Sequence, residues 1–386
     1  MHSMIRFLVA VSLAITLSAC SSVVEYIQPA EKNPLAELTD FDEKVTLSEA
    51  WQISLAENDH RLHLYPAISN DRVYVADGEG LLQSLDLATG KVVWLNETEA
   101  TLSGGPGVND RYVAVGTRDA ELLMFAAIDG QLIWRQRVSS EVLSTPVMDD
   151  QRVIVRTIDG KVTALSLTDG AQLWQFEREI PALTLRGSSS PVLQDGVVYF
   201  GLAGGRLVAL NAETGAVVWD TTVSVPRGRS ELERLADIDA PPVLLDGIAY
   251  VSTFQGQVAA INARNGQAMW RRNFSSYRSM DTDRKSLYAA DDKGLVWAFD
   301  LDTGAARWRQ EGLKNRQTSD VVSLGGLVIA GDIEGYLHVM SAADGAFLGR
   351  IELDDPIESG LVAINGHVLV QDRGGRLTLL KVSAQP

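Results

Sequence analysis

One short phrase recurs along this chain and limits what it can fold into. The phrase joins an Asn or Asp, a turn that ends in glycine, and a tryptophan four residues after that glycine, as in "ALNAETGAVVW" at 209–219. The turn glycine recurs at Gly90, Gly130, Gly170, Gly215, Gly266, Gly304 and Gly345. Trp94, Trp134, Trp174, Trp219, Trp270 and Trp308 follow the first six, and Gly349 follows the seventh. A period of roughly 40 residues indicates a repeat fold.

A single unit reads as four short strands. In residues 189–222, "SPVLQ", "VVYFGL", "RLVALNA" and "AVVWDTT" are separated by turns at Asp195-Gly196, Gly204-Gly205 and Thr214-Gly215. The runs are rich in β-branched and aromatic residues, and they are too continuously apolar for strands that face water on one side. The sequence therefore predicts an all-β fold, a β-propeller of four-stranded antiparallel blades. Each tryptophan is expected on the outer strand of its blade, packed against the adjoining blade.

The number of blades follows from how the repeats begin and end. The turn into the third strand, together with that strand, can be counted eight times along the chain. The last copy, "GGRLTLLKVS" at 374–383, stops before any turn glycine or tryptophan. At the other end, "VTLSEAWQISL" at 45–55 offers Trp51 with no module before it. We expect this N-terminal strand to complete the last blade with the three C-terminal strands, which closes an eight-bladed ring and removes its open edge. A seven-bladed ring remains the alternative if one divergent unit is not a blade.

The first residues read as an export signal. Arg6 precedes an apolar run at 7–17, which is too short to span a bilayer. The run ends in "LSAC", which resembles the lipobox of bacterial lipoproteins and implies cleavage after residue 19 with a lipid on Cys20. Ser21 in the next position favours the outer membrane over retention at the inner one. An ordinary secretory signal with an incidental cysteine is the alternative.

Three segments follow from this interpretation: a signal peptide at 1–19, a lipidated tether at 20–45, and the propeller at 46–386. The tether carries two prolines and many charges without a sustained period. Cys20 is the one cysteine in the sequence, so no disulfide can form within the chain. The net charge of −16 argues against nucleic-acid binding, because phosphate recognition needs clustered Lys and Arg.

The repeat phrase resembles that of pyrroloquinoline-quinone propellers. Combined with the lipobox and eight such units, the chain is similar over its whole length to the lipoprotein family of the outer-membrane β-barrel assembly machinery. The resemblance implies a non-catalytic scaffold without a cofactor, anchored at the periplasmic face of the outer membrane. It also implies docking on the machinery's central barrel protein, BamA, contact with its other members, and help in delivering unfolded outer membrane proteins for insertion.

Two connections between neighbouring blades are longer than the rest, at 177–191 and 224–242. They should emerge side by side on one face of the ring as exposed loops. They resemble the family's L-x-L-R-G and D-x-D-x-x-P loops, so the resemblance implies that they contact BamA. Arg186 is expected to pair with an Asp of the second loop or with a carboxylate of the partner; merely long, solvated loops are the alternative. The residues carried over are Leu183, Leu185, Arg186, Asp237 and Asp239.

A periplasmic quinoprotein dehydrogenase is the rival interpretation. Few residues of this chain match those that such an enzyme needs. A single cysteine cannot form the vicinal disulfide that covers the quinone in many such enzymes. Trp297 lies off the outer-strand register, where packing explains it, and Asp300 and Asp302 fit a turn better than a calcium loop. His60 and His63 form an H-x-x-H pair without a zinc-site frame. We therefore expect no catalytic residue and no metal site, while a propeller that binds another periplasmic partner remains open.

Overall fold

The computed structural model describes residues 33–385, apart from 58–61, 179–188, 226–229 and 231–234. Residues 36–386 form one compact unit, and residues 33–35 are assigned to another. All regular structure in the described residues is β-strand. No helix among them has the length and apolarity needed to cross a membrane.

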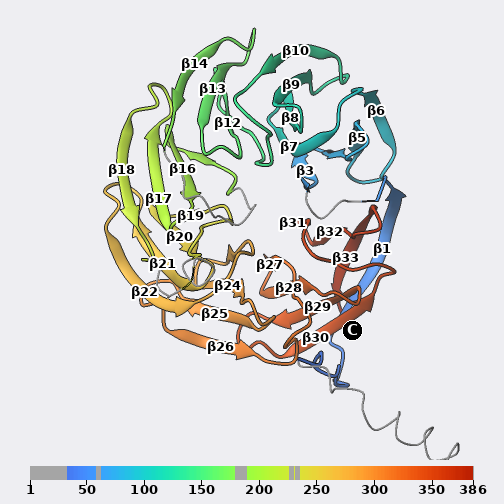
Figure 1. Ribbon diagram of the computed structural model, residues 1–386. Coiled ribbons are helices and arrows are strands. Elements are labelled where there is room, and N and C mark those ends of the chain that lie inside the picture. Colours follow the sequence, from blue (N-terminus) through green and yellow to red (C-terminus); the bar gives the residue numbers. More distant parts are fainter. Residues whose placement is uncertain (1–32, 58–61, 179–188, 226–229, 231–234, 386) are drawn as a thin grey trace, which may run out of the picture. The chain divides into compact units, whose positions relative to one another are not determined.

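Thirty-three strands in the described part of the chain form eight sheets, which follow one another around a ring (Figure 1). Seven sheets each use four consecutive strands in antiparallel order, and we number these sheets as blades 1 to 7. Blade 8 contains the last three strands and the first one. A short strand, β2 (His63–Leu64), adds to blade 2 in parallel with β7.

The strands of blades 1 to 4 are β3 (Ala67–Ser69), β4 (Arg72–Ala76), β5 (Leu81–Asp86) and β6 (Val92–Glu97); β7 (Leu102–Val108), β8 (Tyr112–Thr117), β9 (Glu121–Ala126) and β10 (Leu132–Arg137); β11 (Val147–Met148), β12 (Arg152–Arg156), β13 (Val162–Ser166) and β14 (Gln172–Phe176); and β15 (Val192–Gln194), β16 (Val197–Leu202), β17 (Arg206–Asn211) and β18 (Val217–Thr222).

The strands of blades 5 to 8 are β19 (Val243–Leu245), β20 (Ile248–Ser252), β21 (Gly256–Asn262) and β22 (Ala268–Phe274); β23 (Asp281–Thr282), β24 (Ser286–Ala290), β25 (Val296–Asp300) and β26 (Ala306–Gln310); β27 (Val321–Leu324), β28 (Leu327–Gly331), β29 (Tyr336–Ser341) and β30 (Phe347–Glu352); and β31 (Leu361–Ile364), β32 (His367–Gln371), β33 (Arg376–Ala384) and β1 (Val45–Ser54).

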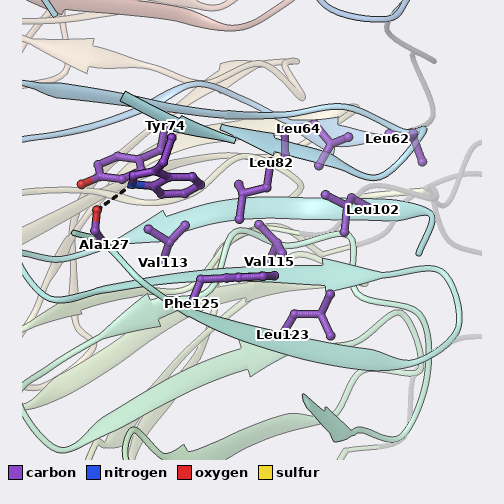
Figure 2. Packing of buried hydrophobic residues seen from close by; sticks show 12 residues of the cluster. Leu62, Leu64, Tyr74, Leu82, Leu102, Val113, Val115, Leu123, Phe125 and Ala127 are labelled. Carbon is purple, nitrogen blue, oxygen red and sulfur yellow. Dashed lines mark hydrogen bonds between the residues drawn. The ribbon is translucent and has the colours of Figure 1, made fainter. Parts of the chain in front are cut away.

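The hydrophobic core lies between the blades rather than within them. Eight clusters of buried apolar side chains each combine residues of two neighbouring blades. In the cluster between blades 1 and 2, Tyr74 and Leu82 pack against Val113 and Phe125 (Figure 2). The cluster that joins Trp51 and Leu379 of blade 8 to Val73 of blade 1 completes the circle. Eight blades with eight shared cores make a closed ring, so the seven-bladed alternative is wrong.

The repeated tryptophan forms the same contact at each of seven junctions. Its indole lies over the turn glycine of the next blade, so a Cβ on Gly215 would come within 2.7 Å of Trp174. Its Nε1–H donates to a backbone carbonyl of that next blade over 2.7 to 2.9 Å. Figure 2 shows one of these bonds, which ends on the carbonyl of Ala127. The expected packing of each tryptophan against the adjoining blade is confirmed.

The Asn or Asp of the phrase fixes the turn that presents the glycine. Asn211 Oδ1 accepts the N–H of Thr214 at 2.9 Å and the hydroxyl of the same residue at 3.0 Å. Gly215 then takes a φ of +71°, which glycine adopts without the steric cost that a Cβ brings. The two halves of the phrase therefore serve one contact: the first half shapes the turn of a blade, and the tryptophan packs against the turn of the following blade.

The eighth junction departs from the phrase because β1 occupies it. Strand β1 pairs antiparallel with β33 from Val45 to Ser54, as the sequence predicted, and the two strands lie together in Figure 1. A Cβ on Gly349 would lie 2.4 Å from the carbonyl oxygen of Val45, so no side chain fits where the other blades carry tryptophan. Trp51 of β1 supplies the missing indole for blade 1, where its Nε1–H donates to Leu87 O at 2.8 Å.

Before β1 begins, the chain contacts blade 7 and the connection that leads into it from blade 6. The N–H of Ala36 donates to Lys314 O at 2.9 Å, and the guanidinium of Arg316 donates to Ala36 O at 3.0 Å. Phe41 stacks on Phe347 with ring centroids 5.7 Å apart, and the guanidinium of Arg350 lies over Phe41. These contacts place residues from Ala36 onward with the propeller, ahead of the boundary that the sequence suggested at residue 46.

We predict that Gly215→Ala destabilises the protein more than Gly196→Ala does. Both glycines have positive φ, +71° and +74°, so both substitutions carry the left-handed backbone cost of roughly 1–2 kcal/mol. The Cβ on Gly215 also meets Trp174, whereas nothing lies within 4 Å of one on Gly196. Overpacking of this kind adds about 1–3 kcal/mol. Equal losses in the free energy of unfolding, measured with denaturant, would contradict the role given to the indole contact.

Candidate functional site

The two long connections flank blade 4. The first, 177–191, joins β14 to β15, and the second, 224–242, joins β18 to β19. Their C-terminal ends touch, because the hydroxyl of Ser189 donates to Ala240 O at 2.9 Å. The expectation that the connections stand side by side is therefore met at these ends. Leu183, Leu185 and Arg186 lie outside the described residues.

The described end of the second connection is not an exposed loop. From residue 235 to 240 every residue except Asp239 is buried. Ile238 packs where a Cβ on Gly201 would sit, at 2.2 Å, and its N–H donates to Leu202 O. The expectation of exposure is wrong for this part, because the ring needs a segment here to cross from one blade to the next.

The same crossing occurs at other junctions. Val142 lies over Gly116 and Ile357 lies over Gly331 in the way that Ile238 lies over Gly201. The N–H of Ile357 likewise donates to the backbone of the preceding blade, at Asp332 O. Residues 235–240 are thus this repeat's ordinary crossing segment, and the extra length of the second connection precedes them.

Asp237 has a structural task within this segment. In blades 1, 6, 7 and 8 an aspartate after the second strand caps the following turn, as Asp332 does for the N–H groups of Glu334 and Tyr336. Blade 4 has Leu202 at that position, which offers no acceptor. Asp237 supplies one from the crossing segment, since its Oδ1 accepts the N–H of Gly204 at 3.0 Å. The side chain is 3% exposed.

Asp239 differs from Asp237 because no turn uses it. It is half-buried, and its Oδ2 is buried without a hydrogen-bond partner among the described residues. Burial raises the pKa of Asp239 to about 7, Asp237 adds to the rise, and Arg156 opposes it. Because Oδ2 is shielded from solvent, another molecule can reach only the exposed remainder of this half-buried residue.

Arg156 is the residue of this site that our sequence reasoning missed. It ends β12 in blade 3, is 7% exposed, and donates from Nη1 to Ser189 O at 3.1 Å. Burial lowers its pKa to about 10, against the opposing effect of Asp239 and Asp237. The signal was present in the repeat register, since most other blades carry a small residue at this position.

The enzyme candidates have structural explanations in the described residues. Trp297 stacks parallel to Phe299, at 5.7 Å between ring centroids, and donates its Nε1–H to Asp291. Asp300 accepts the N–H and the hydroxyl of Thr303, which is turn chemistry. His60 lies outside the described residues and His63 is in β2. No group of three or more His, Cys, Asp or Glu side chains in the described residues is arranged to hold a metal ion.

We predict that Asp239→Asn removes part of the pH dependence of stability. The unfolded carboxyl has a pKa of about 3.9, and the folded one about 7. Between these values the folded state keeps a proton that the unfolded state has lost, so the free energy of unfolding falls as pH rises. Asn has no proton to lose, so the variant should gain stability relative to wild type from pH 5 to pH 8. A constant difference across denaturant titrations at both pH values would contradict the assignment.

One known protein family matches most of the chain. The family described as "Outer membrane protein assembly factor BamB" matches residues 36–102 and 78–310. Relatives of that name are 40% identical in Kangiella koreensis, over 95% of this chain and 93% of the relative, and 40% identical in Pseudomonas aeruginosa, over 95% and 96%. The relative from Escherichia coli K12 is 31% identical over 94% and 95%.

Solved structures give the same architecture. The crystal structure of BamB from Moraxella catarrhalis matches with a TM-score of 0.80 at 27% identity, over 87% of this chain and all of that chain. Quinohemoprotein alcohol dehydrogenase from Comamonas testosteroni matches with a TM-score of 0.67 at 14% identity, over 86% and 76%, which is a likeness of fold alone. By its near full-length relatives and its family match, this chain belongs to the BamB family of outer membrane protein assembly factors.

Proposed function

We propose that this protein is a non-catalytic scaffold in the complex that assembles outer membrane proteins. The observation that carries the proposal is similarity over almost the whole chain to curated assembly factors, at 31–40% identity. The closed ring supports it, since a rigid toroid presents its connections in fixed positions. Its task is to help deliver unfolded outer membrane proteins to the machinery that inserts them.

The proposed docking surface for BamA consists of the two long connections beside blade 4. Leu183, Leu185 and Arg186 supply the apolar and bidentate groups typical of interface hot spots. On the second connection Asp239 is the proposed contact residue, because it is only half-buried whereas Asp237 is 3% exposed. Asp237 acts beside it through the turn of blade 4, whose shape it maintains.

The proposed place of work is the periplasmic face of the outer membrane, with a lipid on Cys20 as the anchor. The export signal and the charged, proline-containing segment after it support this location. About 15 residues separate Cys20 from the first contacts of the propeller at Ala36, and a chain of that length reaches at most roughly 50 Å. The ring would thus stay close to the membrane surface, where the barrel protein's periplasmic domains stand.

Charge reversal at the docking surface provides the first test. We expect Arg186→Glu and Asp239→Lys each to lower the amount of BamA co-purified at least about tenfold, since lost charge pairs in interfaces cost 2–5 kcal/mol. Outer membrane porin levels in cells should fall in parallel. Asp150→Lys is the matched control, because this exposed aspartate lies at the β11–β12 turn, far along the strand from Arg156. Wild-type yields for both docking variants, with unchanged thermal melts, would refute the docking surface.

Removal of the anchor provides the second test. In Cys20→Ala the processed chain has no thiol to carry a lipid, so the protein should leave the membrane pellet and appear in the soluble periplasmic fraction. Labelling with radioactive palmitate should be lost at the same time. A variant that still pellets with outer membranes and still incorporates palmitate would show that Cys20 is not the anchor.

A further inference from the structure

Arg156 differs in size and charge from the residues at the same position of the other blades. It stands at the end of the second strand of its blade, four residues before Gly160 in the turn that leads to the third strand. The other seven blades carry six small residues and one glutamine at this position, namely Ala76, Gly116, Gly201, Ser252, Ala290, Gly331 and Gln371. An arginine is both the largest and the one charged residue in the series.

The reason for small residues is visible at three other blades. The segment that crosses to the next blade lies directly over this position, so a Cβ on Gly116 would come within 2.2 Å of Val142. The corresponding distance is 2.3 Å between Gly331 and Ile357. Folding of the ring therefore does not call for a long side chain at this place in a blade.

The contacts of Arg156 connect the ends of both long connections. Its Nη1–H donates to the carbonyl of Ser189, at the end of the first connection. The Ser189 hydroxyl in turn donates to Ala240 O, at the end of the second, and accepts the N–H of Gly201. Beside this chain of bonds, the guanidinium acts electrostatically on Asp239 and Asp237.

The energetics indicate that stability is not the purpose of this arginine. Its Nε is buried without a hydrogen-bond partner among the described residues, and there its guanidinium donates only from Nη1, to Ser189 O. A buried guanidinium in this condition costs stability relative to an apolar side chain of similar length. What the charge does provide is compensation for the two aspartates of the second connection, which repel each other.

We propose that Arg156 is a positioning residue for the docking surface: through Ser189 it holds the described ends of the two long connections together, and it thereby sets the position of Asp239, the residue before Ala240. This inference rests on the proposed docking function. The charged groups that act on Asp239 in the described residues are Asp237, on its own segment, and Arg156, on β12. Since Asp237 raises the pKa of Asp239, Arg156 is the group that favours the charged form.

The test measures binding of the full-length lipidated protein to full-length BamA in detergent, from pH 6 to pH 9. In wild type, affinity should fall as pH drops through the pKa of Asp239, about 7. In Arg156→Met affinity at pH 7 should fall about tenfold, and the midpoint of the pH profile should move to higher pH, because the opposing positive charge is gone. Arg156→Lys, which keeps the charge, should return the midpoint toward the wild-type value.

A double variant separates positioning from a general loss of structure. Because Arg156 and Asp239 act on one surface, Arg156→Met combined with Asp239→Asn should lose less affinity than the sum of the two single losses. Arg152→Met is the matched control, since Arg152 lies at the other end of β12 and pairs with Asp149 at 3.0 Å. It should leave both affinity and midpoint unchanged.

The outcomes distinguish the two proposals. Additive losses in the double variant, or an unchanged midpoint in Arg156→Met, would overturn the positioning role while the docking surface stands. Wild-type binding by Asp239→Asn and Arg186→Glu together would refute the docking surface itself. Should Arg156→Met fail to fold, Arg156→Lys decides the matter, because a wild-type affinity and midpoint in Arg156→Lys are required by the proposal and their loss contradicts it.

Discussion

The contact of an indole with the turn glycine of the next blade is the constraint on which the ring depends. Each tryptophan covers a glycine that no other residue could replace without collision, and it also satisfies a backbone carbonyl there. Because the donor and the acceptor belong to different blades, a blade is complete only with its neighbour in place. The hydrophobic cores lie at the same junctions, so stability is shared between blades and a chain of such units gains most when the last meets the first.

Closure determines what happens where the repeat ends. The final module lacks its fourth strand, and β1 supplies it across the whole length of the chain. The price is a local exception, because the carbonyl of Val45 occupies the space of a tryptophan and only glycine fits at residue 349. The segment before β1 is then held by Arg316, in the connection that leads into blade 7, and by Arg350 of β30. Ala36 and Phe41 are thereby joined to the part of the ring that borders blade 8, where the closing strand lies.

The candidate site illustrates how a repeat fold combines a structural and a binding role in one short segment. Residues 235–240 cross between blades as their counterparts do, and Asp237 replaces a turn cap that blade 4 lacks. Within the described part of the chain, Asp239 and Arg156 serve no turn and no crossing of the repeat, and each affects the pKa of the other. In a repeat protein, residues that depart from the repeat and cost stability without serving the fold are the candidates for functional residues.

The sequence by itself determined the fold, because the spacing of glycine and tryptophan repeats the same physical contact and the unmatched ends can only be completed by each other. It also indicated the two long connections, since length is visible without coordinates. It could not show that Asp237 is buried or that Arg156 bonds to Ser189, whose hydroxyl reaches the second connection. Those facts depend on which side chains meet across blades, and residues some eighty positions apart come together only when the ring has closed and the crossing segment has been laid over the strand ends.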